Sequence, residues 1–145
     1  MEIKHTIGRV SPIIDDALAV RYAVFIEEQG FEPELEIDEY DNTALHVVGY
    51  IDNQPICVAR LIFKESDRVK VGRVAVLKAY RSLGLGNDIM NYLIDYAKKN
   101  HVKEFALSAQ LHAKNFYLKL GFVTQGEIYL EEGVEHIYMV YPNLA

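Results

Sequence analysis

The alternation of hydrophobic and polar residues along the chain predicts a protein in which strands outnumber helices. Runs of alternating or β-branched hydrophobic residues are typical of strands, and they lie at residues 3–9, 45–51, 56–63, 70–77, 102–109, 122–130 and 134–141. The turn-forming sequence Asp52-Asn53-Gln54-Pro55 joins the second run to the third and is typical of a β-hairpin. A second turn sequence, Glu131-Glu132-Gly133, separates the last two runs.

The spacing of hydrophobic residues predicts a first helix that begins near Pro12 and runs to about Gln29. Ser11 is a favourable N-cap, and Pro12 suits the first helical position because no N–H group is needed there. Gly30 is expected to end the helix. The hydrophobic face is expected to carry Ile14, Leu18, Tyr22, Phe25 and Ile26.

Residues 84–100 show the clearest helical periodicity in the chain. The buried stripe of this helix is expected to contain Leu85, Ile89, Met90, Leu93, Ile94 and Ala97. Asp88 near its start, and Lys98 and Lys99 near its end, suit the helix macrodipole. A shorter helix is predicted at residues 112–120, with Gly121 as its end.

The predicted order of elements is β-α-β-β-β-α-β-α-β-β. A uniformly wound parallel sheet needs a crossover helix after every strand, so this order favours a mixed sheet with helices on both faces. Residues 27–41 are acidic and contain no Lys or Arg, which is typical of a solvated loop.

Composition and charge narrow the classes of function. The 145 residues fit a single domain, residues 1–145, and a net charge of -6 disfavours nucleic acid, whose phosphates require clustered Lys and Arg. The start of the chain lacks the apolar core of a signal peptide, and no later segment is apolar enough to span a bilayer, so no membrane partner is expected. The single cysteine, Cys57, lies in a predicted strand and is expected to be buried and inert. One cysteine excludes an internal disulfide and favours the cytoplasm, and no Cys/His spacing indicates a metal site.

A glycine-rich segment between the valine-rich run and the helix at 84–100 predicts an anion site. Gly84 and Gly86 permit unusual backbone conformations and a close ligand, and the unpaired N–H groups at a helix start attract a pyrophosphate. Arg81 can add a charge-assisted contact. No Gly-Lys-Ser/Thr follows as in a P-loop, and Ile89 stands where a dinucleotide fingerprint needs Gly. The alternative is that the two glycines only form a tight turn.

Two motifs resemble signatures of the GNAT superfamily of acyltransferases. Arg81-x-x-Gly84-x-Gly86 is similar to the family's coenzyme A pyrophosphate motif, R/Q-x-x-G-x-G/A. The segment at residues 113–122 is similar to its A-x-x-F-Y-x-x-x-G-F motif. The resemblance implies the GNAT fold of the α/β (α+β) class. In that fold a mixed, mostly antiparallel sheet is splayed at the coenzyme site and flanked by helices on both faces.

A more specific resemblance is to the ElaA-like branch of this superfamily. It rests on residues 21–29 and 133–139 together with Asp38, Asp41 and His46. This likeness carries no acceptor pattern that can be transferred to the chain. The acceptor amine is therefore left open.

The resemblance implies roles for individual residues. Acetyl-coenzyme A is expected to contact Val74, Ala75, Val76, Arg81, Ser82, Leu83, Gly84, Leu85, Gly86, Asn87, Gln110 and Asn115. The amide of Val76 or its neighbour would polarise the thioester carbonyl and stabilise the oxyanion. Tyr117 matches the family position that commonly protonates the departing thiolate. A phenol suits this task because it is neutral at physiological pH and donates a proton.

The acceptor side needs a base, because only a neutral amine attacks a thioester. The candidates for acceptor binding or proton removal are Glu28, Asp38, Asp41, His46 and His136. Histidines titrate near neutral pH, although a histidine on a strand is more often structural. The acidic stretch could attract a cationic amine or simply be solvated. Arg21 and Glu28 are expected to pair across the surface of one helix.

Three functions fit these observations. The first is an N-acetyltransferase that moves an acetyl group from acetyl-coenzyme A to a small primary amine. The second is an acyl-coenzyme A-binding regulatory module without catalysis, and the third is an acetyltransferase of protein N-termini or lysines. Tyr117 favours catalysis, because a binding module has no need of a proton donor there. The final strands could also pair in a homodimer.

Overall fold

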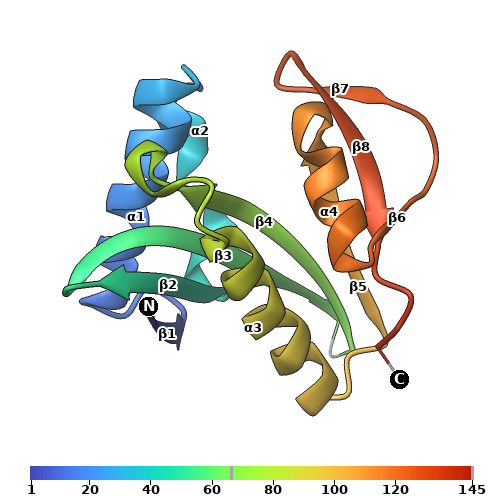
Figure 1. Ribbon diagram of the computed structural model, residues 1–145, viewed down its shortest axis with the longest axis horizontal. Coiled ribbons are helices and arrows are strands. Elements are labelled where there is room, and N and C mark those ends of the chain that lie inside the picture. Colours follow the sequence, from blue (N-terminus) through green and yellow to red (C-terminus); the bar gives the residue numbers. More distant parts are fainter. Residues whose placement is uncertain (66, 145) are drawn as a thin grey trace.

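The computed structural model describes residues 1–65 and 67–144, and its centre is a mixed sheet of eight strands (Figure 1). The strand order is β1-β2-β3-β4-β5-β8-β6, with β7 paired to β8. Among the strands described, β4 and β5 form the only parallel pair. The strands are β1 (Glu2–Ile7), β2 (Leu45–Ile51), β3 (Gln54–Glu65), β4 (Arg68–Val76), β5 (Glu104–Gln110), β6 (Val123–Thr124), β7 (Tyr129–Glu131) and β8 (Val134–Val140).

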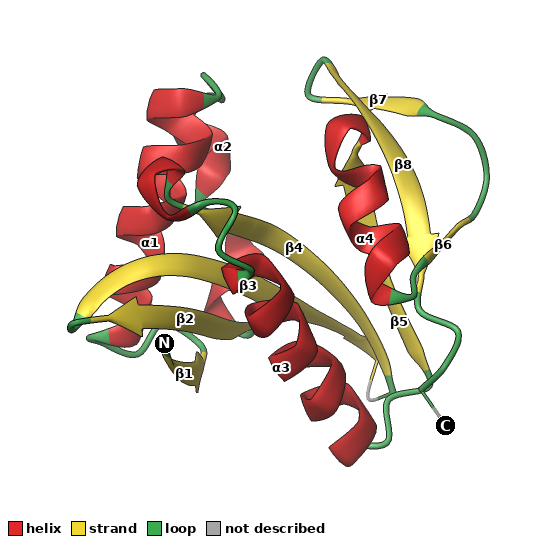
Figure 2. Cartoon of the chain, viewed as in Figure 1, coloured by secondary structure: helices red, strands yellow, loops and turns green. Residues whose placement is uncertain are grey.

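Helices cover both faces of the sheet, as the sequence predicted (Figure 2). They are α1 (Ile13–Arg21), the π-helix η1 (Tyr22–Glu28), α2 (Pro33–Glu36), the 3-10 helix η2 (Glu39–Asn42), η3 (Lys78–Tyr80), α3 (Leu85–Lys99), η4 (Leu111–Ala113) and α4 (Lys114–Leu120). Helix α1 packs on Val48 and Val58, whereas α3 packs with their neighbours Val47 and Cys57 in a separate cluster. Adjacent residues of a strand point to opposite faces, so the two helices lie on opposite sides. None of the helices in the described chain is long and apolar enough to cross a membrane.

The stripe predicted for α3 is confirmed, since each of its six hydrophobic residues is buried. Cys57 is also buried as expected. Burial raises the pKa of its thiol to about 11, so the thiol stays protonated at neutral pH.

The first helix differs from the prediction at its start and along its buried face. Pro12 occupies the cap position before α1, and the Ser11 hydroxyl bonds to Asp15 instead of capping the backbone. Tyr22 is half exposed, while the buried face contains Ile14, Ala17, Val20, Arg21, Val24 and Phe25. The sequence pattern placed Arg21 outside because it is charged, and the π-helical turns of η1 change the spacing after it.

The strand predicted at residues 122–130 is instead two short strands. β6 and β7 are separated by a loop in which Gly126 adopts a positive φ of 86°. A residue in this left-handed region interrupts an extended strand, so the hydrophobic run does not form one element.

The pairing between β4 and β5 stops partway along the strands. It extends from Arg68 to Val71 on β4, opposite the start of β5, and no further. Beyond that point β4 stays bonded to β3, while β5 stays bonded to β8. The two strands therefore meet at one end and separate toward the other (Figure 1). The splayed sheet implied by the family resemblance is confirmed.

A β-bulge on β4 lies where the two strands separate. Val58 and Arg60 of β3 face Ala75 and Gly72 of β4, so one residue of β3 stands opposite two of β4. Arg73 lies in the bulge with a φ of 51°, a conformation that non-glycine residues rarely adopt. Its guanidinium donates hydrogen bonds to the carbonyl oxygens of residues 35 and 36, at 3.3 and 2.9 Å. These bonds hold the bulge against the acidic stretch.

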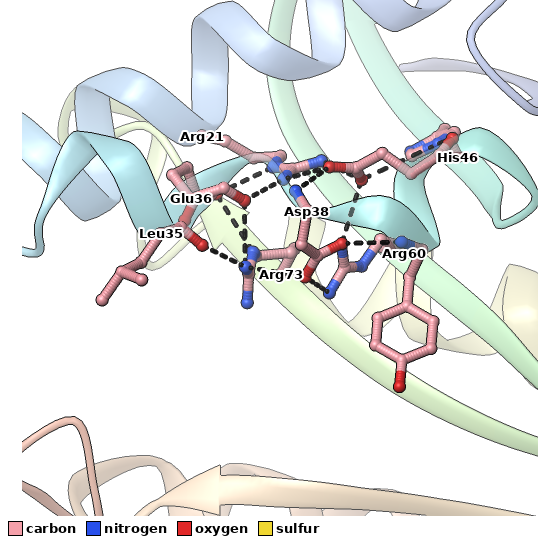
Figure 3. A network of polar contacts seen from close by, with 9 residues as sticks. Arg21, Leu35, Glu36, Asp38, His46, Arg60 and Arg73 are labelled. Atoms are coloured by element: carbon pink, nitrogen blue, oxygen red, sulfur yellow. Dashed lines mark hydrogen bonds and ion pairs between the residues drawn. The ribbon is translucent and has the colours of Figure 1, made fainter.

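The acidic stretch is not a solvated loop, because two of its carboxylates are buried in a charge cluster (Figure 3). Asp41 is 0% exposed and accepts hydrogen bonds from Arg21 at 2.8 Å and from Arg60 at 3.0 Å. Glu36 accepts a bond from Arg21 at 2.8 Å, which replaces the Arg21–Glu28 surface pair expected from the sequence. We call Arg21, Glu36, Asp38, Asp41, Arg60 and Arg73 the charge cluster; it balances three guanidinium groups with three carboxylates.

The charge cluster keeps the carboxylate of Asp41 ionised despite burial. Burial acts to raise the pKa of Asp41, but hydrogen bonds and the attraction of Arg21 outweigh it and hold that pKa well below its usual range. Burial lowers the pKa of the neighbouring His46, whose Nε2 donates to the Asp41 carbonyl oxygen at 2.9 Å. A neutral histidine beside the cluster adds no charge to it.

Replacing Asp41 with Asn is expected to destabilise the fold by about 3–5 kcal/mol, because it leaves two buried arginines without their shared carboxylate. Urea unfolding measures this loss, with Glu34→Gln on the exposed side of the same segment as the control. The pKa of Asp41 is depressed by folding, so its stabilisation is present above the pKa of an unfolded aspartate, about 4, and is lost as the pH falls below it. Equal losses for the two variants at neutral pH would contradict the role given to the charge cluster.

Candidate functional site

A cavity of about 830 Å³ opens between the separated ends of β4 and β5. We call it the gap cavity. Its lining contains most of the residues predicted to bind the coenzyme, namely Val74, Ala75, Val76, Arg81, Ser82, Gly84, Leu85, Gly86, Asn87 and Gln110. Leu83 and Asn115 are exposed and lie outside this lining. The topology thus brings two distant parts of the sequence to one cavity.

The end of β4 presents a free backbone N–H group to the gap cavity. The Leu77 N–H donates to the Ile56 carbonyl oxygen of β3 at 2.9 Å, and Val76 lies opposite Cys57. Peptide groups alternate direction along an antiparallel strand, so those of Val76 point away from β3 and into the gap. The Val76 carbonyl oxygen accepts a bond from Arg81 Nε at 2.9 Å. The Val76 N–H is left as a donor facing the cavity.

The glycine-rich segment forms the N-terminal end of α3. Gly84 has a φ of 78°, a left-handed conformation that a glycine adopts without strain. A Cβ at Gly86 would meet the Phe116 ring at 3.2 Å, so a larger residue there would require the ring to shift. The first helical bond runs from Asp88 N–H to the Gly84 carbonyl oxygen. The N–H groups of residues 85–87 therefore have no acceptor within the helix and can bind an anion.

Arg81 is engaged in an ion pair at the rim of the gap cavity. Its two terminal nitrogens bond to the two carboxylate oxygens of Glu28, from η1. The hydrogen bond from Arg81 lowers the pKa of Glu28, which therefore stays ionised. An anion bound at the start of α3 would share Arg81 with Glu28.

Tyr117 lies at the inner end of the gap cavity and is 7% exposed. Its ring packs edge-on against Phe116 and Phe122, and its hydroxyl has no hydrogen-bond partner among the described residues. Burial raises the pKa of Tyr117, so the phenol keeps its proton at neutral pH. Such a group can act as an acid but not as a base under these conditions.

A second cavity of about 500 Å³ lies on the other side of the separated strands. We call it the face cavity. Val74, Gln110 and Tyr117 line both cavities, so the two meet where β4 and β5 diverge. His136 lines the face cavity, and its Nδ1 donates to the Val134 carbonyl oxygen at 2.7 Å. This bond fixes a proton on Nδ1, so Nε2 is the ring nitrogen that can accept a proton. Nε2 lies 3.4 Å from a Glu131 oxygen.

The other acceptor candidates lie in different places. Asp38 lines the face cavity, but its carboxylate is bonded to Arg60 at 2.7 Å. Asp41 is buried within the charge cluster and His46 is buried beside it, and neither residue lines either cavity. Glu28 lines the gap cavity with Arg81. Within residues 1–65 and 67–144, no group of three or more His, Cys, Asp or Glu side chains is arranged to hold a metal ion.

Several lining residues were not predicted from the sequence. Gln29 accepts a hydrogen bond from Gln110 at 3.0 Å and so bridges η1 and β5 across the gap. Phe116 forms the wall beside Gly86. Gln29 and Gln110 are 81 positions apart in the sequence, so no local pattern signals their contact.

Comparison with known proteins agrees with this geometry. The chain matches the Acetyltransferase (GNAT) domain family over residues 14–142. YjcF, an uncharacterized N-acetyltransferase of Bacillus subtilis, is 35% identical over 95% of this chain and 99% of its own length. The crystal structure of Escherichia coli ElaA aligns with a TM-score of 0.86 and 29% identity, over 96% of this chain and 97% of that one. An acyl-CoA N-acyltransferase from Pseudomonas aeruginosa aligns with a TM-score of 0.82 and 28% identity, over 96% and 97%. The chain belongs to the GNAT acetyltransferase family and resembles its ElaA branch.

Proposed function

We propose that this protein is an N-acetyltransferase that moves an acetyl group from acetyl-coenzyme A to a primary amine by direct attack on the thioester. One observation carries the proposal. A free strand N–H at Val76, the open start of α3 and the buried phenol of Tyr117 line a single cavity. The similar protein from Pseudomonas aeruginosa is an acyl-CoA N-acyltransferase, which supports the same class of coenzyme.

The coenzyme fits the gap cavity by its chemistry. The pyrophosphate would accept hydrogen bonds from the N–H groups of residues 85–87, with Arg81 nearby. The pantetheine arm would lie along the backbone of Val74 and Val76 in place of a neighbouring strand. Its thioester would then reach the region of Tyr117, where the gap cavity meets the face cavity.

Catalysis would follow from the groups at this junction. The nitrogen of a neutral amine, entering from the face cavity, forms a bond to the carbonyl carbon. The Val76 N–H stabilises the oxyanion that develops on the carbonyl oxygen. When the carbon–sulfur bond breaks, the sulfur takes the proton of the Tyr117 hydroxyl. The proton lost by the amine passes to His136 Nε2 or to water, and the tyrosinate recovers a proton from solvent.

Replacing Gly84 with Asp is expected to weaken acetyl-coenzyme A binding at least tenfold, because a carboxylate would stand in the anion site. Calorimetric titration of the purified protein measures the affinity. Gly84→Asn has the same shape without the charge and should bind more tightly than the Asp variant.

Gly126→Asp is the control for backbone strain at a positive φ. Gly126 has a φ of 86° and open space around it, but it lies outside the gap cavity. A wild-type protein that does not bind acetyl-coenzyme A would refute the proposed function. Equal affinities for the Asp and Asn variants would refute the placement of the pyrophosphate.

Replacing Tyr117 with Phe is expected to lower kcat about 100-fold with little change in coenzyme affinity, because only the proton donor is lost. Thiol release with a panel of small amines and lysine peptides measures the rate. A protein that binds acetyl-coenzyme A but releases no thiol with any amine would instead be the regulatory binding module.

Replacing His136 with Gln is expected to lower kcat at neutral pH, and the deficit should narrow as the pH rises. The reason is that the amine substrate then loses its proton without help from a base. The pH profile of kcat for the two proteins measures this effect. A deficit that is constant with pH would assign His136 a structural role only.

A further inference from the structure

The charges of the face cavity are unequally compensated. Its carboxylates from the acidic stretch, Glu36 and Asp38, are already bonded to arginines of the charge cluster. Glu131 lies beside His136 at 3.4 Å, and Glu132 of the same turn also lines the cavity, with no Lys or Arg within 4.0 Å among the described residues. On β3 and β4, Lys64 and Lys70 line the cavity and likewise have no carboxylate within 4.0 Å in the described chain. The acidic stretch therefore does not make this cavity attractive to a second cation.

The two lysines lie on the floor of the face cavity, on adjacent strands. Lys70 of β4 stands opposite Ile62 of β3, Lys64 lies at a bulge further along β3, and all three residues line the face cavity. Lys64 also lies over the Tyr40 ring at 4.9 Å, and Tyr40 lines the same cavity. Two lysines from adjacent strands thus contribute to the lining.

Arg73 adds a third donor to the same floor. Its Nη2 donates to the carbonyl oxygens of residues 35 and 36 and contacts the Asp38 carboxylate, and its buried Nε lies 3.1 Å from a Glu36 oxygen. Its Nη1 makes no hydrogen bond within the described chain, and the residue lines the face cavity. One terminal nitrogen of Arg73 carries no contact line in Figure 3. An anion lying between Arg73 and Lys70 would satisfy this donor.

Gly72 leaves open the space between these cations and the junction of the two cavities, where the reaction is proposed to occur. It lines the face cavity between Lys70 and Val74, and a side chain built there would meet nothing within 4 Å. From Lys70 to Val74 the strand rises roughly 13 Å, a span that an extended ligand and the flexible side chain of Lys70 can cover together. A bound molecule can lie over Gly72 with one end at each.

We propose that the acceptor is an amine that also carries an acidic group, held with its amine at the junction of the two cavities and its acid over Lys70, Lys64 and Arg73. This inference rests on the proposed function and gives its acceptor a chemical class. Of the two ends of the acceptor, the acid supplies the affinity and the amine supplies the reaction.

The test compares two probes of similar shape, ε-aminocaproate and its primary amide, in which a neutral amide group replaces the carboxylate. Their affinities for the coenzyme A-loaded protein are measured by calorimetry, which needs no turnover. The acid is expected to bind at least tenfold more tightly than the amide. Lys70→Ala should remove most of this preference and leave the affinity for the amide unchanged.

Two further variants separate this site from general effects. Lys99→Ala removes a lysine of α3 that lines neither cavity and should change nothing. Gly72→Val adds side-chain volume at the floor, where a Cβ meets nothing within 4 Å, and should weaken both probes while leaving coenzyme A binding intact. Equal affinities for the two probes, or no binding of either, would overturn the proposed acceptor class while coenzyme A still binds. A protein that does not bind coenzyme A would overturn the proposed function itself, and this inference with it.

Discussion

The separation of β4 from β5 is the constraint on which the rest of the structure depends. A parallel pair of strands would normally satisfy both backbones, but here the pairing ends at Val71. The bulge at Arg73 turns the end of β4 away, so that the peptide groups of Val76 face a cavity instead of a strand. A ligand with its own amide and carbonyl groups, such as a pantetheine arm, can replace the missing partner. The backbone donor that β4 leaves without a partner therefore indicates where a ligand would bind.

The charge cluster explains how such an open arrangement stays in place. Arg73 is held in a rarely populated conformation by carbonyl groups of the acidic stretch, and that stretch is held in turn by Arg21 and Arg60. Buried ion pairs often contribute little net stability, but removing one partner is costly because the other charge remains. The charge cluster therefore contributes more to the position of the face-cavity wall than to the net stability of the fold. That wall bounds the face cavity, so the same contacts that shape the gap also set the charge of the acceptor side.

Local patterns in the sequence predicted the features that depend on local chemistry. The stripe of α3, the left-handed glycine at its start and the buried Cys57 follow from periodicity and residue type. The sequence pattern assigned three charged residues to the surface, Arg21, Glu36 and Asp41. They are buried because Arg21 pairs with Glu36, 15 positions away, and with Asp41, 20 positions away, and no local pattern signals these ion pairs. The bulge at Arg73 gave no signal, since arginine has no preference for a positive φ. The two motifs located the lining of the gap cavity, where we propose that the coenzyme binds, whereas the face cavity is built from contacts between distant strands and its ligand was left open.

The central claim is that the separated strands receive the coenzyme. The most direct measurement is an amide NMR titration of the nitrogen-labelled protein with coenzyme A. The account predicts the largest shifts at Val74, Val76 and residues 85–87, which line the gap cavity, and small shifts on β1 and β2 at the far side of the sheet. Binding that leaves the signals of Val76 and residues 85–87 unchanged would contradict it.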